Sequence, residues 1–144
     1  MKEQNCKNHS QVVPMYHFVA GILIVAGLVG AVVNFVRACQ HESGRIVAAL
    51  LVVIFVITIL FYWYARAFAL RAQDRAIRAE ENLRYFSMTG KLMDGKLRMG
   101  QIIALRFAPN EEFVALAARA VNENLRSGQI KEAIINWRAD HHRV

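Results

Sequence analysis

Two long apolar segments occupy the first half of the chain. Residues 15–36 and residues 46–64 contain no Lys, Arg, Asp or Glu. As a helix rising about 1.5 Å per residue, the first segment reaches roughly 33 Å, enough for a bilayer core of about 30 Å. Buried helices of soluble proteins rarely have such long uncharged runs. The pattern predicts transmembrane helix 1 at residues 15–36 and transmembrane helix 2 at residues 46–64.

The distribution of charge predicts how the two segments are oriented across the membrane. Residues 37–45 are few enough to force an antiparallel helical hairpin, so both termini lie on one side. Arginines near the ends of membrane segments favour the cytoplasm. Two lie in the connecting loop, Arg37 and Arg45, and five follow the second segment, namely Arg66, Arg71, Arg75, Arg78 and Arg84. We therefore expect a cytoplasmic tail at residues 1–14, a periplasmic loop at residues 37–45, and Cys6 and Cys39 on opposite sides of the membrane.

A regular apolar register follows the second segment. No Gly or Pro interrupts residues 45–86, so the helix should continue through a juxtamembrane part, residues 65–86. Spacings of four and three, typical of a heptad repeat, define a helix-packing seam at Ala65, Ala69, Ala72, Ala76, Ala79, Leu83 and Phe86. Arg75 and Glu80 have the offset that pairs charges across two parallel helices, and Glu80 can also pair with Arg84 one turn on. The seam could pack between copies, pack on this chain's own C-terminal domain, or reflect only the helix propensity of alanine.

Small residues also recur within the first apolar segment. They form two rows with a spacing of four, and Asn34 lies one turn beyond one of them. Such rows allow close helix packing in membranes, and the second span of the same hairpin is the expected neighbour. The candidate transmembrane packing residues are Ala26, Gly27, Gly30, Ala31 and Asn34.

The remaining residues, 87–144, predict a small cytoplasmic helical domain. We expect a short helix at residues 101–107 and a second helix that begins at Pro109, is capped by Asn110 and stops at Gly128. A last helix should present Ile130, Ala133, Ile134 and Trp137 on one face. About 55 residues give a marginal core alone, so the domain should need the long helix, the membrane surface or another copy. The fold class predicted is an all-α membrane protein.

Several tracts carry a resemblance to a known family. They are residues 8–10, 13–18, 70–84, 100–108, 111–116 and 136–140. Together they resemble a family of short uncharacterised bacterial membrane proteins, and the resemblance covers nearly the whole chain. It implies a multi-pass protein of the bacterial inner membrane with two spans. It brings no established activity and no known catalytic residues, and nothing in these residues supports the transporter-permease label that some relatives carry.

The sequence offers little for chemistry. Residues 90–97 nearly match a phosphate-binding loop, but Leu97 replaces the hydroxyl that must hold magnesium, and no strand precedes the loop. Histidines at matched depth, which a haem between spans would need, are missing, and no serine or cysteine has a credible base beside it. We expect no catalytic residue, cofactor or metal. Anionic lipid accounts for the basic residues near the membrane, and the candidate lipid-headgroup contacts are Arg66, Arg71, Lys91 and Lys96.

These observations predict a non-enzymatic, membrane-anchored assembly or accessory protein. Its partners would be the lipid bilayer and either its own copies, as a homo-oligomer, or a larger membrane complex as an accessory subunit. The net charge of residues 65–144, fourteen Lys or Arg against nine Asp or Glu, is too dispersed to indicate nucleic acid, and no small-molecule substrate is identified. The alternative is a small transport component or oligomeric pore. A subunit that completes another protein's active site is a third interpretation.

Overall fold

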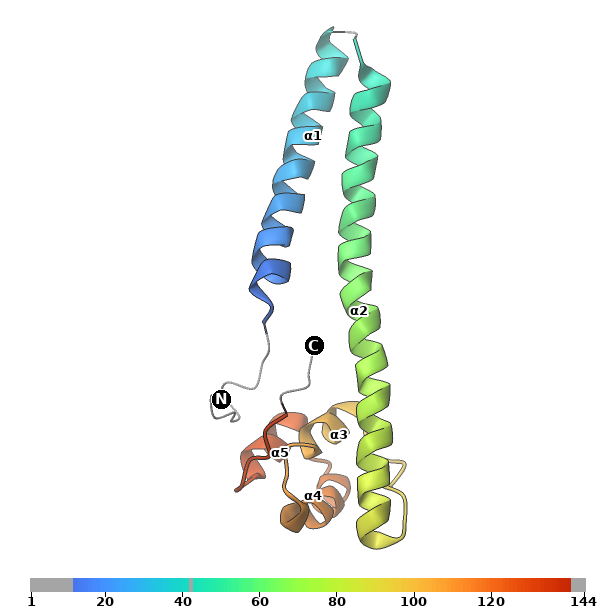
Figure 1. Cartoon of the computed structure of the whole chain (residues 1–144), viewed down its shortest axis with the longest axis vertical. Helices are drawn as coiled ribbons and strands as arrows, with labels where there is room; N and C mark the ends of the chain where they lie inside the picture. Colours follow the sequence, from blue (N-terminus) through green and yellow to red (C-terminus); the bar gives the residue numbers. More distant parts are fainter. Residues whose placement is uncertain (1–11, 42, 141–144) are drawn as a thin grey trace. The chain divides into compact units, whose positions relative to one another are not determined.

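The computed structural model describes residues 12–41 and 43–140. Within these ranges all regular structure is helical and no strand forms, which confirms the all-α prediction. A π-helical turn, η1 (Met15–Ala20), precedes five α-helices (Figure 1): α1 (Gly21–His41), α2 (Arg45–Thr89), α3 (Met99–Leu105), α4 (Asn110–Asn122) and α5 (Ser127–Ala133). The described chain divides into two compact units, residues 12–68 and residues 69–140, and α2 runs without a break through both.

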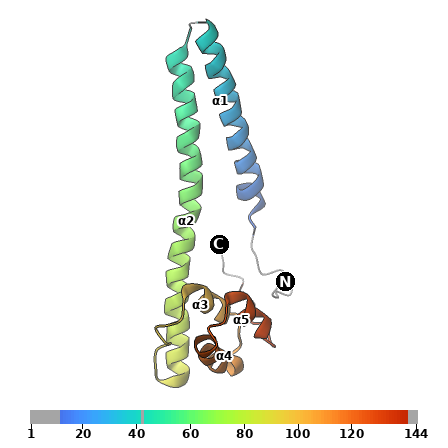
Figure 2. The same ribbon diagram turned by 180° about the vertical axis from the view of Figure 1, so that it is seen from behind.

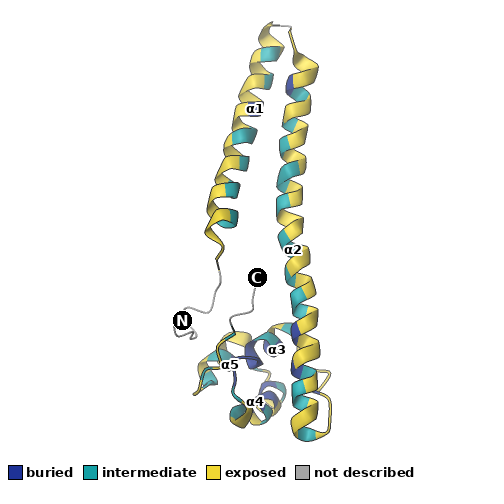
Figure 3. Cartoon of the chain, in the orientation of Figure 1, coloured by how far each residue is buried: buried dark blue, intermediate teal, exposed yellow. Residues whose placement is uncertain are grey.

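The first unit contains two helical segments that are long and apolar enough to cross a membrane. They are η1 with α1, 27 residues, and α2, 45 residues. Among the described residues from 12 to 68, only Ala31 and Ala48 are buried (Figure 3). Large aromatic side chains of the same unit are exposed, with Phe61 at 72% and Trp63 at 71%. The core helix of a soluble protein would bury most of such residues. An apolar surface of this extent is unstable in water.

The helices extend beyond the apolar segments. α1 continues through Arg37 to His41, and α2 begins at Arg45, so residues 42–44 separate the two helices. Gly44 has a φ of +70°, a left-handed conformation that glycine adopts without steric cost. The prediction of one uninterrupted helix to about residue 86 is confirmed. α2 ends three residues later, at Thr89, because Gly90 also has a φ of +70° and its N–H bonds the Phe86 carbonyl at 2.8 Å.

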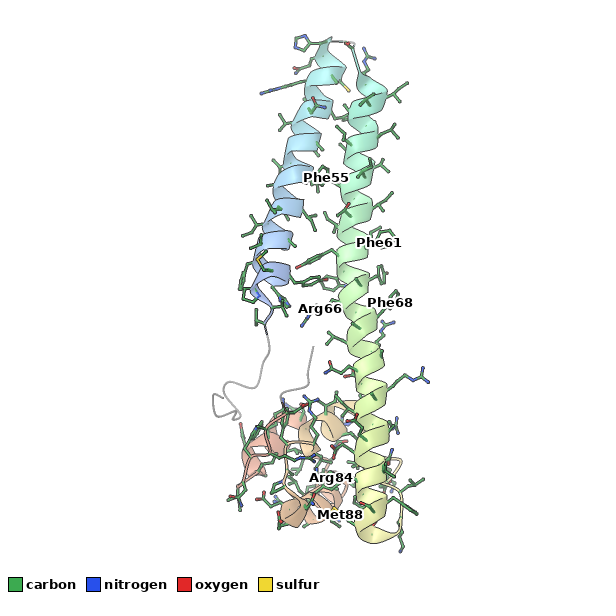
Figure 4. The ribbon with its side chains drawn as sticks, in the orientation of Figure 1. Phe55, Phe61, Arg66, Phe68, Arg84 and Met88 are labelled. Carbon is green, nitrogen blue, oxygen red and sulfur yellow. The ribbon has the colours of Figure 1, made fainter. Side chains whose placement is uncertain are left out.

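Aromatic and small side chains connect the two long helices within residues 12–68. The rings of Tyr16 and Tyr62 stack with centroids 4.4 Å apart, and each hydroxyl donates to the backbone carbonyl of the other residue. Nearer the connecting residues, Phe55 covers Gly27 (Figure 4). A Cβ built on Gly27 would lie 2.2 Å from Cε1 of Phe55, so a larger residue at this position would force the phenyl ring to move.

The second unit is a small helical domain. Figures 1 and 2 both show α3, α4 and α5 gathered beside the last turns of α2. Phe107, Phe113, Ile102, Leu105 and Ile130 are its largest fully buried side chains. Tyr85 of α2 packs against this core, so α2 is part of the domain. A core of this size is marginal by itself, which explains why the domain includes the end of the long helix.

Three details of the predicted C-terminal helices were wrong. The first short helix is α3, Met99–Leu105, two residues earlier than expected. The helix that begins after Pro109 ends at Asn122, and Gly128 lies inside the next helix, α5, instead of stopping α4. Helix α5 itself ends at Ala133, so Trp137 lies outside any helix.

Candidate functional site

Arg84 holds α2 against the segment between α3 and α4. Its Nε and Nη2 donate to Oδ1 of Asn110 at 2.9 and 2.7 Å, and Nη2 also donates to the Ala108 carbonyl at 2.8 Å. Its Nη1 donates to Glu81 at 3.1 Å. The guanidinium carbon lies 4.2 Å from the ring centroid of Phe113 in α4, a cation–π distance. One side chain therefore connects three parts of the domain (Figure 4).

These contacts correct two expectations. Asn110 does not cap α4, because its side-chain oxygen accepts the hydrogen bonds of Arg84, and Pro109 occupies the N-cap position. Arg84 pairs with Glu81, three residues before it, and not with Glu80. Glu81 is 6% exposed, so this ion pair is shielded from solvent, where a lost partner is costly.

A non-helical segment after α5, residues 134–140, crosses the domain, and we call it the C-terminal strap. The carboxylate of Glu112 in α4 accepts the backbone N–H of Ile135 at 2.9 Å and of Asn136 at 3.0 Å. The backbone N–H of Arg138 donates to the carbonyl of Phe107 at 2.8 Å. A carboxylate that accepts two successive N–H groups makes charge-assisted hydrogen bonds, which fix the path of the strap.

Side chains fasten the same strap. Trp137 stacks on Phe107 with centroids 4.5 Å apart, and Asp140 pairs with Arg106 at 2.9 Å. Arg106 is 5% exposed, and its guanidinium carbon lies 4.6 Å from the Phe107 ring centroid. The ring of Trp137 therefore packs on Phe107 from an extended segment, and not from the helical face that the spacing predicted.

Two cavities adjoin α2 and the strap. The larger, about 660 Å³, reaches Pro109 and Glu111, and the smaller, about 380 Å³, reaches Ile77 and Asp140; Glu80, Glu81 and Arg138 line both. Charged groups of both signs line them, and the ion pairs Arg84–Glu81 and Arg106–Asp140 connect parts of the fold. A lining with so many charged groups does not suit the capture of an apolar ligand.

An exposed ion pair lies near the end of α4. On the exposed face of α4, Arg119 donates to Glu123 at 3.1 Å. This hydrogen bond lowers the pKa of the Glu123 carboxyl and raises the pKa of Arg119. The pair is solvent-exposed, so it contributes little to stability.

Gln101 is a structural residue that the sequence interpretation did not single out. Its Oε1 accepts the N–H of Arg98, and its Nε2 donates to the carbonyls of Ala120 and Leu125 at 3.2 and 2.9 Å, which joins the start of α3 to the end of α4. Gln129 accepts the N–H of Arg126 at 2.8 Å in the same way at the start of α5. Both helices thus begin with the pattern Arg-x-Gly-Gln, a signal present in the sequence.

All seven seam residues are exposed within the single chain. Leu83 and Phe86 are 69% and 48% exposed. The face of α2 that packs on the domain carries Ile77, Glu81 and Tyr85 instead. Packing of the seam on this chain's own C-terminal helices is therefore not what the structure shows, and packing between copies stays a prediction.

The structure separates the two small-residue rows of α1. Gly27 lies under Phe55 and Ala31 is buried, whereas Ala26, Gly30 and Asn34 are exposed. Of the candidate lipid contacts, Arg71, Lys91 and Lys96 are exposed and Arg66 is half-buried.

No group of three or more His, Cys, Asp or Glu side chains within residues 12–41 and 43–140 could hold a metal ion. The His and Cys side chains near the two ends of the chain, Cys6, His9, His141 and His142, lie outside the described residues.

The comparisons with known proteins give one match. The fold defines a class of protein. Its regular structure in the described residues is all helical, with two long apolar helices and a small domain that carries charged side chains. The model of a family of unknown function (DUF6526) matches residues 1–144, and the chain belongs to this family. No curated protein and no solved structure matches it.

Proposed function

We propose that the chain is a non-enzymatic, membrane-anchored assembly or accessory protein of the bacterial inner membrane. In this proposal, α1 and the first half of α2 form a transmembrane hairpin. The cytoplasm contains both termini, because five arginines follow the second span and two lie in the connecting loop. The main support for a membrane anchor is the exposure of apolar side chains in residues 12–68. Of the described residues in this range, only Ala31 and Ala48 are buried.

The contacts of the domain support an assembly role. α2 has no interruption between Arg45 and Thr89, so one helix supplies residues to both the span and the domain. The buried charged side chains that a catalytic interpretation would consider first, Arg106 and Glu81, make ion pairs that hold helices and strap together. The surface beside them is lined by charges of both signs, as in polar protein–protein contacts.

The test exchanges the spans while keeping the domain. Residues 15–64 would be replaced by an unrelated two-span hairpin of the same topology, joined in helical register at Ala65. If the spans only anchor the protein, the complex extracted from membranes by mild detergent should keep its native size on native gel electrophoresis. A complex that dissociates when the spans are exchanged would contradict the proposal, because the spans themselves would then form the functional assembly, as in a pore. A variant with the spans kept and residues 65–144 deleted is the matched control and should lose the complex, because it lacks both the seam and the helical domain.

A further inference from the structure

Two large apolar side chains are exposed on the water-facing part of α2. Leu83 is 69% exposed and Phe86 is 48% exposed, although both lie in the unit with a packed core. They occupy consecutive positions of the heptad register, and the five alanines before them in that register are exposed as well. Exposed apolar side chains that continue one helical register over three heptads mark a contact face.

This face differs from the one that holds the domain. At 3.6 residues per turn, the centre of the seam lies about 130° around the helix from Ile77, which is 7% exposed and faces the domain. A second helix on the seam would leave Ile77, Glu81 and Arg84 in their places. Both faces of α2 can thus be occupied at the same time.

We propose that a second copy of this chain occupies the seam, as a parallel pair of α2 helices between about Ala65 and Phe86. The register averages 3.5 residues, the repeat of two helices that supercoil around each other, and not the 3.6 of a single straight helix. The inference rests on the proposed function, because two chains anchored in one membrane with the same topology must bring their α2 helices out in the same direction.

Charges on either side of the seam fit this occupant. Arg75 and Glu80 are exposed and flank the seam on opposite sides, each about 70° from its centre. Five residues separate them, so Arg75 of one copy meets Glu80 of the other twice in a parallel pair with two-fold symmetry. The neighbouring flanking pairs, Phe68 with Gln73 and Asn82 with Ser87, bring no like charges together.

The seam alanines limit the affinity of the proposed pair of α2 helices. Small seam residues bury little area but allow close approach, so a coil of this length would be weak in dilute solution. Confinement of both copies in one membrane raises their effective concentration and compensates for the small area. The interface is thus suited to chains in a bilayer, and the test needs the full chain in native membranes.

The first experiment is disulfide cross-linking of the full chain in native membranes, in a Cys6→Ser, Cys39→Ser background. Ala76→Cys and Leu83→Cys, on the seam, should form dimers rapidly on mild oxidation. Arg78→Cys, exposed on the far side of the same helix, is the matched control and should not. Equal cross-linking at position 78, or no dimer at positions 76 and 83, would overturn the proposal.

Charge reversal then tests the partner and its direction. Arg75→Glu and Glu80→Arg should each slow cross-linking through Leu83→Cys by roughly three- to tenfold, because like charges then meet twice. The double reversal should restore the rate. If it does not, the two residues do not face each other across copies and the parallel pair is wrong. A disulfide within one chain between Cys6 and Leu83→Cys, in a variant that keeps Cys6, would place the N-terminal segment on the seam and also overturn the proposal.

Alkaline extraction of the same membranes distinguishes this inference from the anchor. A chain that stays in the membrane pellet and forms no seam dimer would leave the anchor intact and reject the pairing. Release into the supernatant would contradict the anchor, and with it the common direction that the pairing needs. Retention together with seam-specific dimers supports both.

Discussion

Replacing Arg84 with alanine is expected to lower the free energy of unfolding of the domain by about 3–5 kcal/mol. The change removes the hydrogen bonds to Asn110 and Ala108 and the cation–π contact with Phe113. It also leaves Glu81, 6% exposed, without the ion pair that compensates for its burial. Urea unfolding of the full chain in detergent, followed by Trp137 fluorescence in a Trp63→Phe background, measures the loss.

Two further variants make this result interpretable. Arg78→Ala removes an exposed arginine from the same helix and should change the free energy of unfolding by less than about 0.5 kcal/mol. Adding Glu81→Gln to Arg84→Ala should recover part of the loss, because no unpaired carboxylate then remains buried. Equal effects of Arg84→Ala and Arg78→Ala would show that the Arg84 contacts do not hold the domain together.

Replacing Trp137 with alanine is expected to cost about 2 kcal/mol, below the ~3–5 kcal/mol range for a fully buried aromatic side chain, because Trp137 is half-buried. The substitution removes the ring that stacks on Phe107, which is itself fully buried. The strap should then detach from the segment that follows α3, with faster hydrogen exchange at the Arg138 amide, which bonds the Phe107 carbonyl. Hydrogen exchange read by mass spectrometry over residues 99–140 measures both effects.

Ile135 gives a control two residues away in the same strap. Its side chain is 85% exposed, so Ile135→Ala should leave both stability and exchange nearly unchanged. If Ile135→Ala and Trp137→Ala behave alike, the strap is not held through the Phe107 stack. Glu112→Gln separates the contribution of this carboxylate, because it weakens the hydrogen bonds that Glu112 accepts from the backbone N–H groups of Ile135 and Asn136 and from Nδ2 of Asn136.

The long elements were predictable because their signals are long. An uncharged segment such as residues 15–36, and the absence of Gly and Pro from residues 45–86, each extend over many helical turns, so single residues cannot mislead. Gly90 ends α2 close to where it was expected, since glycine adopts a φ of +70° without steric cost.

The short elements were harder to predict because tertiary contacts decide them. Asn110 is a suitable helix cap, but Arg84, 26 residues earlier, takes its side-chain oxygen. Trp137 has the spacing of a helical face, yet Phe107 and Glu112 hold its segment in an extended path. Gly128 looks like a terminator, and only the Arg-x-Gly-Gln pattern that it shares with residues 98–101 marks it as the beginning of a helix.

The candidate site was predictable only in part, for the same reason. Spacing along α2 predicts the seam, because a heptad register concerns a single helix, and the exposure of its residues leaves its occupant a proposal. The spacing could not reveal that Ile77 and Glu81, on another face, would hold the domain, nor that tracts as far apart as Arg84 and Asn110, or Arg106 and Asp140, would meet. Which of the two rows in α1 lies against Phe55 likewise needed the structure.

The central claim is that the chain is a membrane anchor with both termini in the cytoplasm. Thiol labelling of spheroplasts, in which the inner membrane is sealed and accessible from outside, tests it most directly. The side chain of Cys39 is exposed near the end of α1, in the part of the chain that should face the periplasm. A membrane-impermeant thiol reagent should label Cys39 and spare Cys6 until the membrane is permeabilised. Labelling of Cys6 while Cys39 stays protected would invert the topology and contradict the account.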